Sequence, residues 1–600
     1  MDSNSIKEIN SHRIFDHKPG LFVLFFTEMW ERFSYYGMRA LFVLFLTSTL
    51  IDGGFGWDKS SAQELYGIYT AFVYFTPLIG GIIADRLLGY RNAVVAGAII
   101  MTAGHAVLAF ETPVMFYTGL ALLILGNGLF KPNISSIVGQ LYKKDPEKKD
   151  GAYTIFYMGI NAGAFLGILL CGYIGENISW SYGFGLAGIF MFVGALQFYF
   201  GQGIFGKLGL LGSGDAADEY GTEVEETPDS TQTQTIIEQP EDNTSSIRGL
   251  RWGIIGLIAG ALVAALVVQL SVEGGLFNGE ISLFEFFGEN PKELMAPIIF
   301  GAVIGFIGWI VSDPTLKGVD KDRVWVIVIL SFFTIFFWWA FEQAGSSMTI
   351  FARDFTARTL EGGAANFFRI TDAILTIGPV AVITYVLVKL FGVTFKHISL
   401  SNAILGIGFA FVWFLVIWRV ARNFSGSTTE VDASWFGILN SFFIITFAPL
   451  FSKIWASKVI NSGPVKFAIG LFLLAFGFGL LAFGSSSIPA GAETAAVSMV
   501  WLIFAYLFHT LGELCVSPVG LSYVSKLAPV RIVGLMFGVF FIANFVANYS
   551  AGKTASYIDP ISEEKGLSFF FLIFTVIPAA MGVVLLLLNK RLKKMMHGIE

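Results

Sequence analysis

The sequence has few charged residues and very few cysteines. Asp, Glu, Lys and Arg make up 14 % of the 600 residues, whereas an ordinary soluble domain has about 25 %. This shortage argues against a large soluble enzyme, whose surface would need more polar side chains than the chain offers. The two cysteines, Cys171 and Cys515, both lie in apolar stretches. We therefore expect no disulfide framework and no metal site.

Motifs that carry enzyme chemistry are missing as well. The chain has no HExxH, no GxSxG with triad partners, no Cys/His cluster and no Walker loop. We therefore expect neither an enzyme nor an ATP-driven pump, no cofactor, and no nucleic-acid partner. The repeated pore loops of many channels are absent too.

Apolar residues are abundant instead, at 55 % of the chain with 62 Phe. Runs of about 20 apolar residues recur, and each is long enough to cross a bilayer as a helix. The runs do not alternate polar and apolar residues, so helices are the expected spanning form. The composition predicts an all-α membrane protein. We count sixteen segments, at roughly 21–50, 62–86, 91–110, 114–141, 151–173, 181–205, 250–270, 294–312, 323–350, 366–391, 399–421, 434–456, 465–485, 496–526, 531–551 and 567–589.

The distribution of charge predicts the orientation. Loop 141–150 carries four Lys and the tail 589–598 is rich in Lys and Arg, whereas 271–293 carries five Glu and one Lys. Placing the basic loops inside puts both termini in the cytoplasm, because sixteen is an even number of spans. Residues 1–20 are polar and do not form a cleavable signal, so the first apolar run is the first span. We expect a multi-pass protein of the cytoplasmic membrane.

The first apolar segment carries charges that lipid would reject. Each charge inside a membrane costs about 2.5–3.5 kcal/mol, so it needs a partner or an aqueous cavity. We favour a pathway or substrate site over a structural ion-pair network, because a single ion-pair contact between two helices does not need four charges. The residues, which fall on one stripe of a helix, are Glu28, Glu31, Arg32, Tyr35 and Arg39.

Later segments add further polar groups. Lys131 is a candidate to bind a carboxylate or to be linked to a proton, although a plain salt bridge is the alternative. Asn161 fits an interhelix hydrogen bond as well as a ligand contact. Counting charges, the acids Glu28, Glu31, Glu342 and Glu513 stand against the bases Arg32, Arg39 and Lys131. A surplus carboxylate could therefore carry a proton.

These motifs, in this order, resemble the proton-dependent oligopeptide transporters, a branch of the major facilitator superfamily. The resemblance covers about 20–205, 250–355 and 434–592. The matching residues are ExxER with Tyr-Tyr-Gly at 28–37, GGxxADRxxG at 80–89, Lys131, FYxxINxG at 156–163, Phe-Glu-Gln at 341–343 and GELxxSPxGLS at 512–522.

The resemblance implies the major facilitator fold, with an N-terminal six-helix bundle over 1–205 and a C-terminal one over 322–600. Between them lie a Ser/Thr/Glu-rich acidic linker at 206–249 and two linker helices at 250–321. It implies a monomer in the lipid bilayer that imports di- and tripeptides with protons by alternating access. A same-fold transporter of nitrate or a peptide-like drug is the alternative.

The resemblance also implies a role for each matching residue. Arg39 and Lys131 would meet the peptide carboxylate, while Asn161, Asn440 and Glu342 would meet its amino group. The remaining roles fall into three groups. Tyr35, Tyr36 and Tyr74 would line the cavity. Glu28, Glu31 and Arg32, with Glu342, would form the proton-coupling groups, and Lys131 with Glu513, Arg39 with Glu342, and the Asp85–Arg86 turn would act in gating.

Two features depart from the family pattern. Animal relatives have a His seven residues before the Tyr of the YxTP turn, and here that position is Gly67. Proton coupling is therefore expected to rest on carboxylates. In addition, about 360–430 inserts a helix pair between the helices of Glu342 and Asn440, within which we expect Arg369 and Asp372 to form a local pair or cap.

Overall fold

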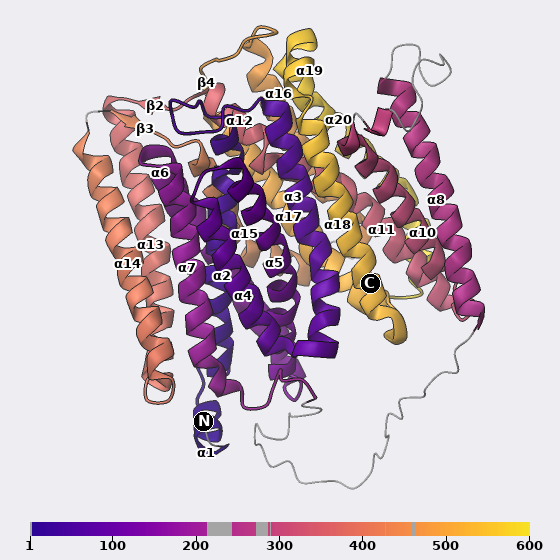
Figure 1. The fold of residues 1–600 in the computed structure, drawn as a ribbon, viewed down its shortest axis with the longest axis horizontal. Helices are drawn as coiled ribbons and strands as arrows, with labels where there is room; N and C mark the ends of the chain where they lie inside the picture. Colours follow the sequence, from indigo (N-terminus) through magenta and orange to yellow (C-terminus); the bar gives the residue numbers. More distant parts are fainter. Residues whose placement is uncertain are drawn as a thin grey trace.

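The structure, a computed structural model, describes residues 3–212, 243–271, 286–288, 290–426, 428–457 and 462–599. These ranges are mainly long helices that run side by side (Figure 1). Within them, fifteen helices are long and apolar enough to cross a membrane. A further helix, α2, has 29 residues, but it also holds the charged stripe of the first segment. Each of the sixteen predicted apolar segments is thus a helix.

The N-terminal bundle contains six of these helices. A short helix, α1 (Ser3–Ser11), precedes it, and the end of the molecule at which α1 lies is called the N-terminal face below. Pro19, Pro113 and Pro146 each stand in the first turn of a helix, where the missing N–H costs nothing. The helices are α2 (Pro19–Thr47), α3 (Lys59–Ile83) with a π-helical turn η1 (Ala84–Leu88), α4 (Tyr90–Leu108), α5 (Pro113–Leu141), α6 (Pro146–Asn177) and α7 (Trp180–Gly201), which ends in the turn η2 (Gln202–Phe205).

Small residues let α6 lie directly against α2. A Cβ at Gly163 would collide with the backbone carbonyl of Met29, and one at Gly167 with that of Phe33. Close approach of this kind is how helices gain packing energy in a membrane. It holds the charged stripe of α2 beside the FYxxINxG segment of α6.

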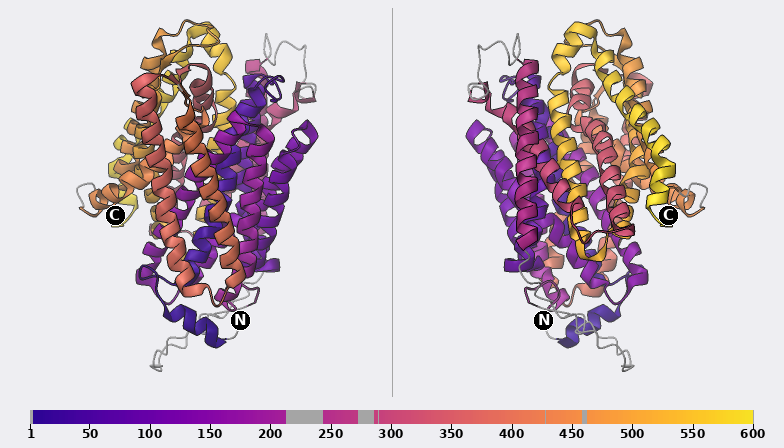
Figure 2. Two further views of the ribbon diagram at one scale, coloured as in Figure 1. Left: turned by 90° about the vertical axis from the view of Figure 1, so that its left-hand side faces the viewer. Right: turned by 90° about the vertical axis from the view of Figure 1, so that its right-hand side faces the viewer.

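The C-terminal bundle also contains six long helices, and Figure 2 shows the two bundles on opposite sides of the molecule. Its first helix, α11 (Val319–Phe341), continues through the turn η6 (Glu342–Gly345) into α12 (Ser347–Asp354). The others are α15 (Ile438–Ala456) after the turn η7 (Ser434–Gly437), α16 (Gly463–Gly484) with η8 (Ser485–Ser487), α17 (Val500–Leu527) with η9 (Val530–Ile532), α18 (Val533–Ala555), and α20 (Leu567–Met595) after the short α19 (Ile558–Lys565).

Two further helices follow the predicted acidic linker. Residues 213–242 of that linker lie outside the described residues. The pair consists of α8 (Asn243–Ser271) and, after the turn η5 (Pro291–Leu294), α10 (Met295–Val311). Ile299 of α10 packs in an apolar cluster with Ala71 of α3 and Phe545 of α18. The pair therefore touches both bundles at one edge of the molecule (Figure 1).

The predicted insertion is a helix pair, α13 (Gly362–Thr394) and α14 (Ser399–Ser425), at the opposite edge (Figure 1). Although it interrupts the C-terminal bundle in sequence, it packs on α7 of the N-terminal bundle. Ser401 donates a hydrogen bond to the carbonyl of Gln197 over 2.8 Å. Small two-residue strands border the pair at the face away from α1: β2 (Thr359–Leu360) pairs antiparallel with β3 (Thr429–Glu430), and β1 (Thr356–Ala357) pairs parallel with β4 (Val497–Ser498).

The expected pairing of Arg369 with Asp372 is wrong, whereas the alternative, a cap at a helix end, is what Arg369 forms at the end of α14. Asp372 forms its ion pair with Arg419 of α14 over 2.7 Å, and Arg369 donates instead to the carbonyls of Gly426 and Thr428 over 2.7 and 2.9 Å. The carboxylate of Asp372 faces α14, where it meets the guanidinium of Arg419. Arg369 instead faces the loop after α14, whose backbone carbonyls need hydrogen-bond donors.

Candidate functional site

The charged stripe of α2 forms a buried cluster. Arg32 donates to Glu31 through both Nη2, over 2.6 Å, and Nε, and its Nε also lies 3.2 Å from a Glu28 oxygen. Asn127 of α5 donates to Glu31 over 3.2 Å. The three charged side chains are at most 2 % exposed. The stripe predicted from spacing is therefore a network that ties α2 to α5.

This cluster holds more carboxyl groups than cations. Two carboxyls share one guanidinium, and the second oxygen of Glu28 has no hydrogen-bond partner among the described residues. A buried carboxylate without a full set of partners is costly. The cluster can lower that cost by holding a proton.

A second charged contact joins the two bundles. Arg39 of α2 donates to Glu342 of η6, and through Nε to the hydroxyl of Tyr66 on α3. Glu342 is only 2 % exposed. The resemblance placed Arg39 and Glu342 together, whereas Tyr66 was missed. It lies eight residues before Tyr74 on the same helix, and this spacing could have revealed it.

Lys131 behaves differently from Arg39. It makes no ion pair with any carboxylate that the structure describes, and its Nζ lies 4.7 Å from the ring centre of Tyr74. Glu28, Glu31 and Glu342 all lie within electrostatic range of it. Lys131 is thus a half-buried cation beside an aromatic ring.

Glu513, the expected partner of Lys131, is bound elsewhere. It accepts a hydrogen bond from Asn440 of α15 over 2.9 Å, and Asn440 also donates to Thr510 over 3.1 Å. In this conformation one predicted gate pair, Arg39 with Glu342, is formed, and the other, Lys131 with Glu513, is not.

The remaining predicted residues lie around this centre in different ways. The rings of Tyr35 and Tyr36 meet edge to face with centroids 5.0 Å apart, below the guanidinium of Arg32. Asn161 donates within its own helix, to the carbonyl of Tyr157 over 3.0 Å. Asp85 and Arg86 are exposed in η1 at the N-terminal face. Neither Asp85 nor Arg86 forms an ion pair with another described residue.

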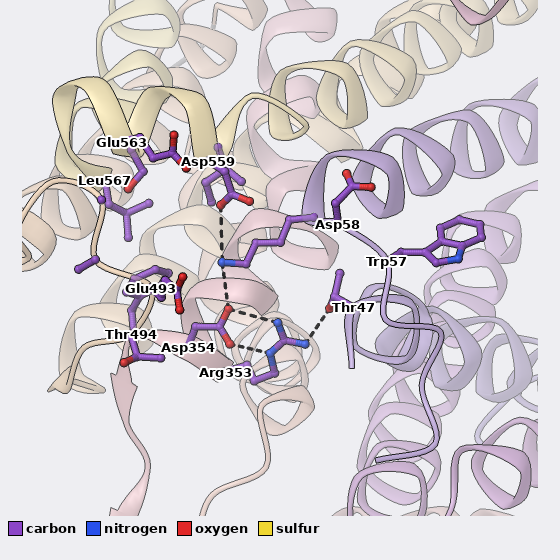
Figure 3. Close-up of a pocket in the computed structure, with 16 residues that line it drawn as sticks. Thr47, Trp57, Asp58, Arg353, Asp354, Glu493, Thr494, Asp559, Glu563 and Leu567 are labelled. Atoms are coloured by element: carbon purple, nitrogen blue, oxygen red, sulfur yellow. Dashed lines mark hydrogen bonds and ion pairs between the residues drawn. The ribbon is translucent and has the colours of Figure 1, made fainter. Parts of the chain in front are cut away.

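The face away from α1 is closed by contacts between the bundles (Figure 3). Lys59 at the start of α3 lies 3.3 Å from Asp354 and 3.5 Å from Asp559. Arg353 donates to Thr47 at the end of α2 over 2.7 Å. These residues border a cavity of about 430 Å³.

Two helices also touch backbone to backbone near this face. A Cβ placed on Gly67 of α3 would lie 2.5 Å from the Cα of Gly552 on α18. No side chain fits there, so the position at which animal relatives carry a His is occupied by a helix contact. The described residues also contain no group of His, Cys, Asp and Glu that could hold a metal ion.

Comparison with known proteins gives consistent matches. The sequence profile of the POT family matches residues 91–218 and 410–570. The chain is 31 % identical to the uncharacterized transporter YclF of Bacillus subtilis, over 100 % of this chain and 99 % of that one. It is 31 % identical to the peptide transporter YePEPT of Yersinia enterocolitica, with 97 % of each chain covered, and 28 % identical to a di-/tripeptide transporter of Lactococcus lactis, with 98 % of each covered.

Solved structures agree. A crystal structure of a peptide transporter POT in complex with sulfate matches with a TM-score of 0.70 at 27 % identity, over 100 % of both chains. A mutant of a peptide transporter POT in complex with alafosfalin matches with a TM-score of 0.70 at 26 % identity, again over 100 % of both. The chain therefore belongs to the POT family, and it is a membrane transporter with the major facilitator fold and not an enzyme.

Proposed function

We propose that this protein imports di- and tripeptides together with protons by alternating access. The observation that carries the proposal is the meeting of opposite charges from the two bundles at Arg39 and Glu342, near Lys131, which has no carboxylate partner among the residues that the structure describes. A peptide is a zwitterion, so it needs a cationic and an anionic pole in one site. Relatives that match over almost their whole length are named peptide transporters.

Each end of the peptide has its own partners in this scheme. Lys131 and Arg39 take the carboxylate. Glu342 takes the amino group, with Asn161 and Asn440 as amide partners, and Arg39 must release Glu342 for it to do so. Tyr35, Tyr36 and Tyr74 supply aromatic walls that tolerate different side chains.

The proton is carried by carboxyl groups of the buried cluster and by Glu342. A proton on Glu28 or Glu31 removes the surplus negative charge beside Arg32, and a proton on Glu342 weakens its hold on Arg39. One charge that crosses a membrane potential of 100 mV gains about 2.3 kcal/mol. This is enough to accumulate peptide inside to about 50 times its outside concentration. No cofactor is needed, since the gradient drives transport.

We place the N-terminal face, which carries the exposed Asp85–Arg86 turn, in the cytoplasm, with both termini, in agreement with the basic loops. The face closed by Lys59 is then the outer face, and the structure is an inward-facing state. To turn outward, the outer contacts must part, and Lys131 must reach Glu513 to close the inner side, where Asp85 and Arg86 act as a latch. A monomer suffices, because one chain supplies both bundles.

The alternative substrates are less well matched. Nitrate has no cationic group for Glu342 to bind, and the buried carboxylate would repel it. A peptide-like drug with both charges would fit the same site and would compete with peptides. A competition arm in the assay below separates these cases.

The test is uptake of dialanine by the full-length protein in proteoliposomes. We expect uptake to rise with an inward proton gradient and to be inhibited by other dipeptides but not by nitrate. Uptake that does not depend on the proton gradient would contradict the symport proposal. Uptake inhibited by nitrate alone would indicate that nitrate, and not a peptide, is the substrate.

Glu31→Gln tests the proton site. We expect gradient-driven uptake to be abolished while counterflow exchange of dialanine continues, because exchange needs no net proton movement. Driven uptake at the original rate would assign the proton to another group.

A further inference from the structure

Two carboxyl side chains outside the transport site meet at the seam between the bundles on the outer face. Glu176 lies at the end of α6, in the N-terminal bundle. Asp432 lies just before η7, which leads into α15 and hence to Asn440 in the C-terminal bundle. Figure 1 shows α6 and β3, which precedes η7, near the upper ends of α13 and α14. We call Glu176 and Asp432 the outer acid pair.

The pair makes direct contacts across the seam. The Glu176 oxygens accept backbone hydrogen bonds from Ala433 over 2.8 Å and from Ser434 over 2.9 Å, so Glu176 caps the first turn of η7 from the other bundle. Asp432 accepts a hydrogen bond from Asn177 over 2.7 Å. A Cβ on Gly172 would collide with Ser434, so α6 and η7 touch closely here.

The outer acid pair lacks a cation of its own. Neither carboxyl forms an ion pair within 4 Å with a residue that the structure describes, although cations lie near. Arg419 is paired with Asp372 over 2.7 Å, and Arg358 is paired with Glu430 over 3.0 Å. The charged and titratable groups that face the pair are Tyr173 on α6, Asp372 on α13, Arg419 and Arg422 on α14, and Arg358 and Glu430 on the β2–β3 side.

We propose that the outer acid pair is a proton-binding switch of the outer gate, separate from the Glu28–Glu31–Arg32 cluster. It holds a proton while α6 and η7 are in contact and releases it to the outside when they part. The proposal rests on the orientation and alternating access proposed above. Acidic conditions outside the cell then favour the closed outer gate.

The titration of Asp432 supports this geometry. Burial and the neighbouring Glu176 raise the pKa of Asp432 from its ordinary value of 3.8 to about 7. When the seam opens, both causes vanish and the pKa returns toward 3.8. A group whose pKa is raised in one state favours that state when protonated. The preference for closure is therefore full below pH 3.8 and is lost as the pH rises through about 7.

The experiment measures the distance across the outer face in the full-length protein without peptide or gradient. Spin labels go on Tyr182→Cys at the start of α7 and Ser486→Cys in η8, both exposed positions, while the two native cysteines are buried. Double electron–electron resonance between pH 4.5 and 8.5 gives the closed fraction. We expect this fraction to fall as the pH rises, with a midpoint at or below about 7.

Four variants decide the outcome. Asp432→Asn should stay closed at every pH, and Glu176→Gln should lower the midpoint by roughly one pH unit, because a like charge is gone. The matched control Glu361→Gln, an exposed acid just before α13 on the same face, should leave the midpoint unchanged. In Glu31→Gln a pH response should persist, because the outer acid pair is intact. A midpoint that survives Asp432→Asn unchanged, or that vanishes only in Glu31→Gln, would overturn the proposal.

The same data separate this proposal from the proposed function. A distance that changes with pH in a protein that takes up no peptide would support the proton-binding switch and contradict the proposed peptide substrate. Peptide uptake with a distance that does not respond to pH would do the reverse.

Discussion

The two ends of this transporter use similar side chains in opposite ways. At the face away from α1, Lys59 lies between Asp354 and Asp559, and α3 touches α18 at Gly67, while Arg39 binds the buried Glu342 between the bundles. At the N-terminal face the Asp85–Arg86 turn is exposed, and Lys131 has no carboxylate partner among the described residues.

This difference teaches that a face closes when its charged side chains bind partners on the opposite bundle, and stays open when they bind partners elsewhere. Glu513 accepts a hydrogen bond from Asn440 while Lys131 lies over a tyrosine ring, so each partner of the proposed inner gate contacts another group instead. The exposed pairs contribute little each, whereas removing one partner of a buried pair is costly because it leaves the other charge buried and unpaired. The substitutions below probe the inner cation first and then two parts of the outer closure.

Lys131→Ala should have the largest effect. Losing a charged partner for the peptide carboxylate costs about 1.5–3 kcal/mol, which lowers dialanine uptake by about 10- to 150-fold. Initial uptake rates in proteoliposomes measure this. Lys317→Ala, which removes an exposed lysine just before α11, outside the site, is the control. A Lys131→Ala protein with the original rate would show that the two ends do not differ in the way described.

Gly67→Ala should come next. The new methyl group would meet the backbone of Gly552, and such overpacking costs about 1–3 kcal/mol. The ratio of closed to open outer face should therefore fall by about 5- to 150-fold, as measured with the spin labels at positions 182 and 486. Gly378→Ala on α13, where a Cβ meets nothing within 4 Å, is the matched control. An unchanged distance would mean that the α3–α18 contact does not hold the outer end closed.

Lys59→Gln should have the smallest effect. Its side chain is 21 % exposed and that of Asp559 is 43 % exposed, so each ion pair contributes about 0.2–1 kcal/mol. Because two pairs are lost, we expect the ratio of closed to open outer face to fall by about two- to thirtyfold, and high salt to produce the same change in the unmodified protein. A larger shift, or one insensitive to salt, would assign Lys59 a role other than surface pairing.

Much of the fold could be predicted from the sequence because local rules govern it. Runs of apolar residues long enough for a bilayer predicted every long helix, including the inserted α13 and α14. The spacing of Glu28, Glu31 and Arg32 predicted one face of one helix, and the structure joins them there. The family resemblance added that Arg39 meets Glu342, a contact between residues 303 positions apart.

Other features depended on how helices pack. Asp372 has Arg369 one turn away on its own helix, yet pairs with Arg419 of the next one. Tyr66 contacts Arg39, and Glu176 contacts the backbone of η7. Each contact depends on how far the two elements are shifted along their axes relative to each other.

The sequence by itself determined that this chain crosses a membrane many times and that a stripe of charge faces inward, since both follow from hydropathy and helical periodicity. Only the tertiary structure decided which acid each cation binds and which end is closed. Spacing along one helix defines a face, but the partner opposite that face is set by the register between helices, and no local pattern encodes that register.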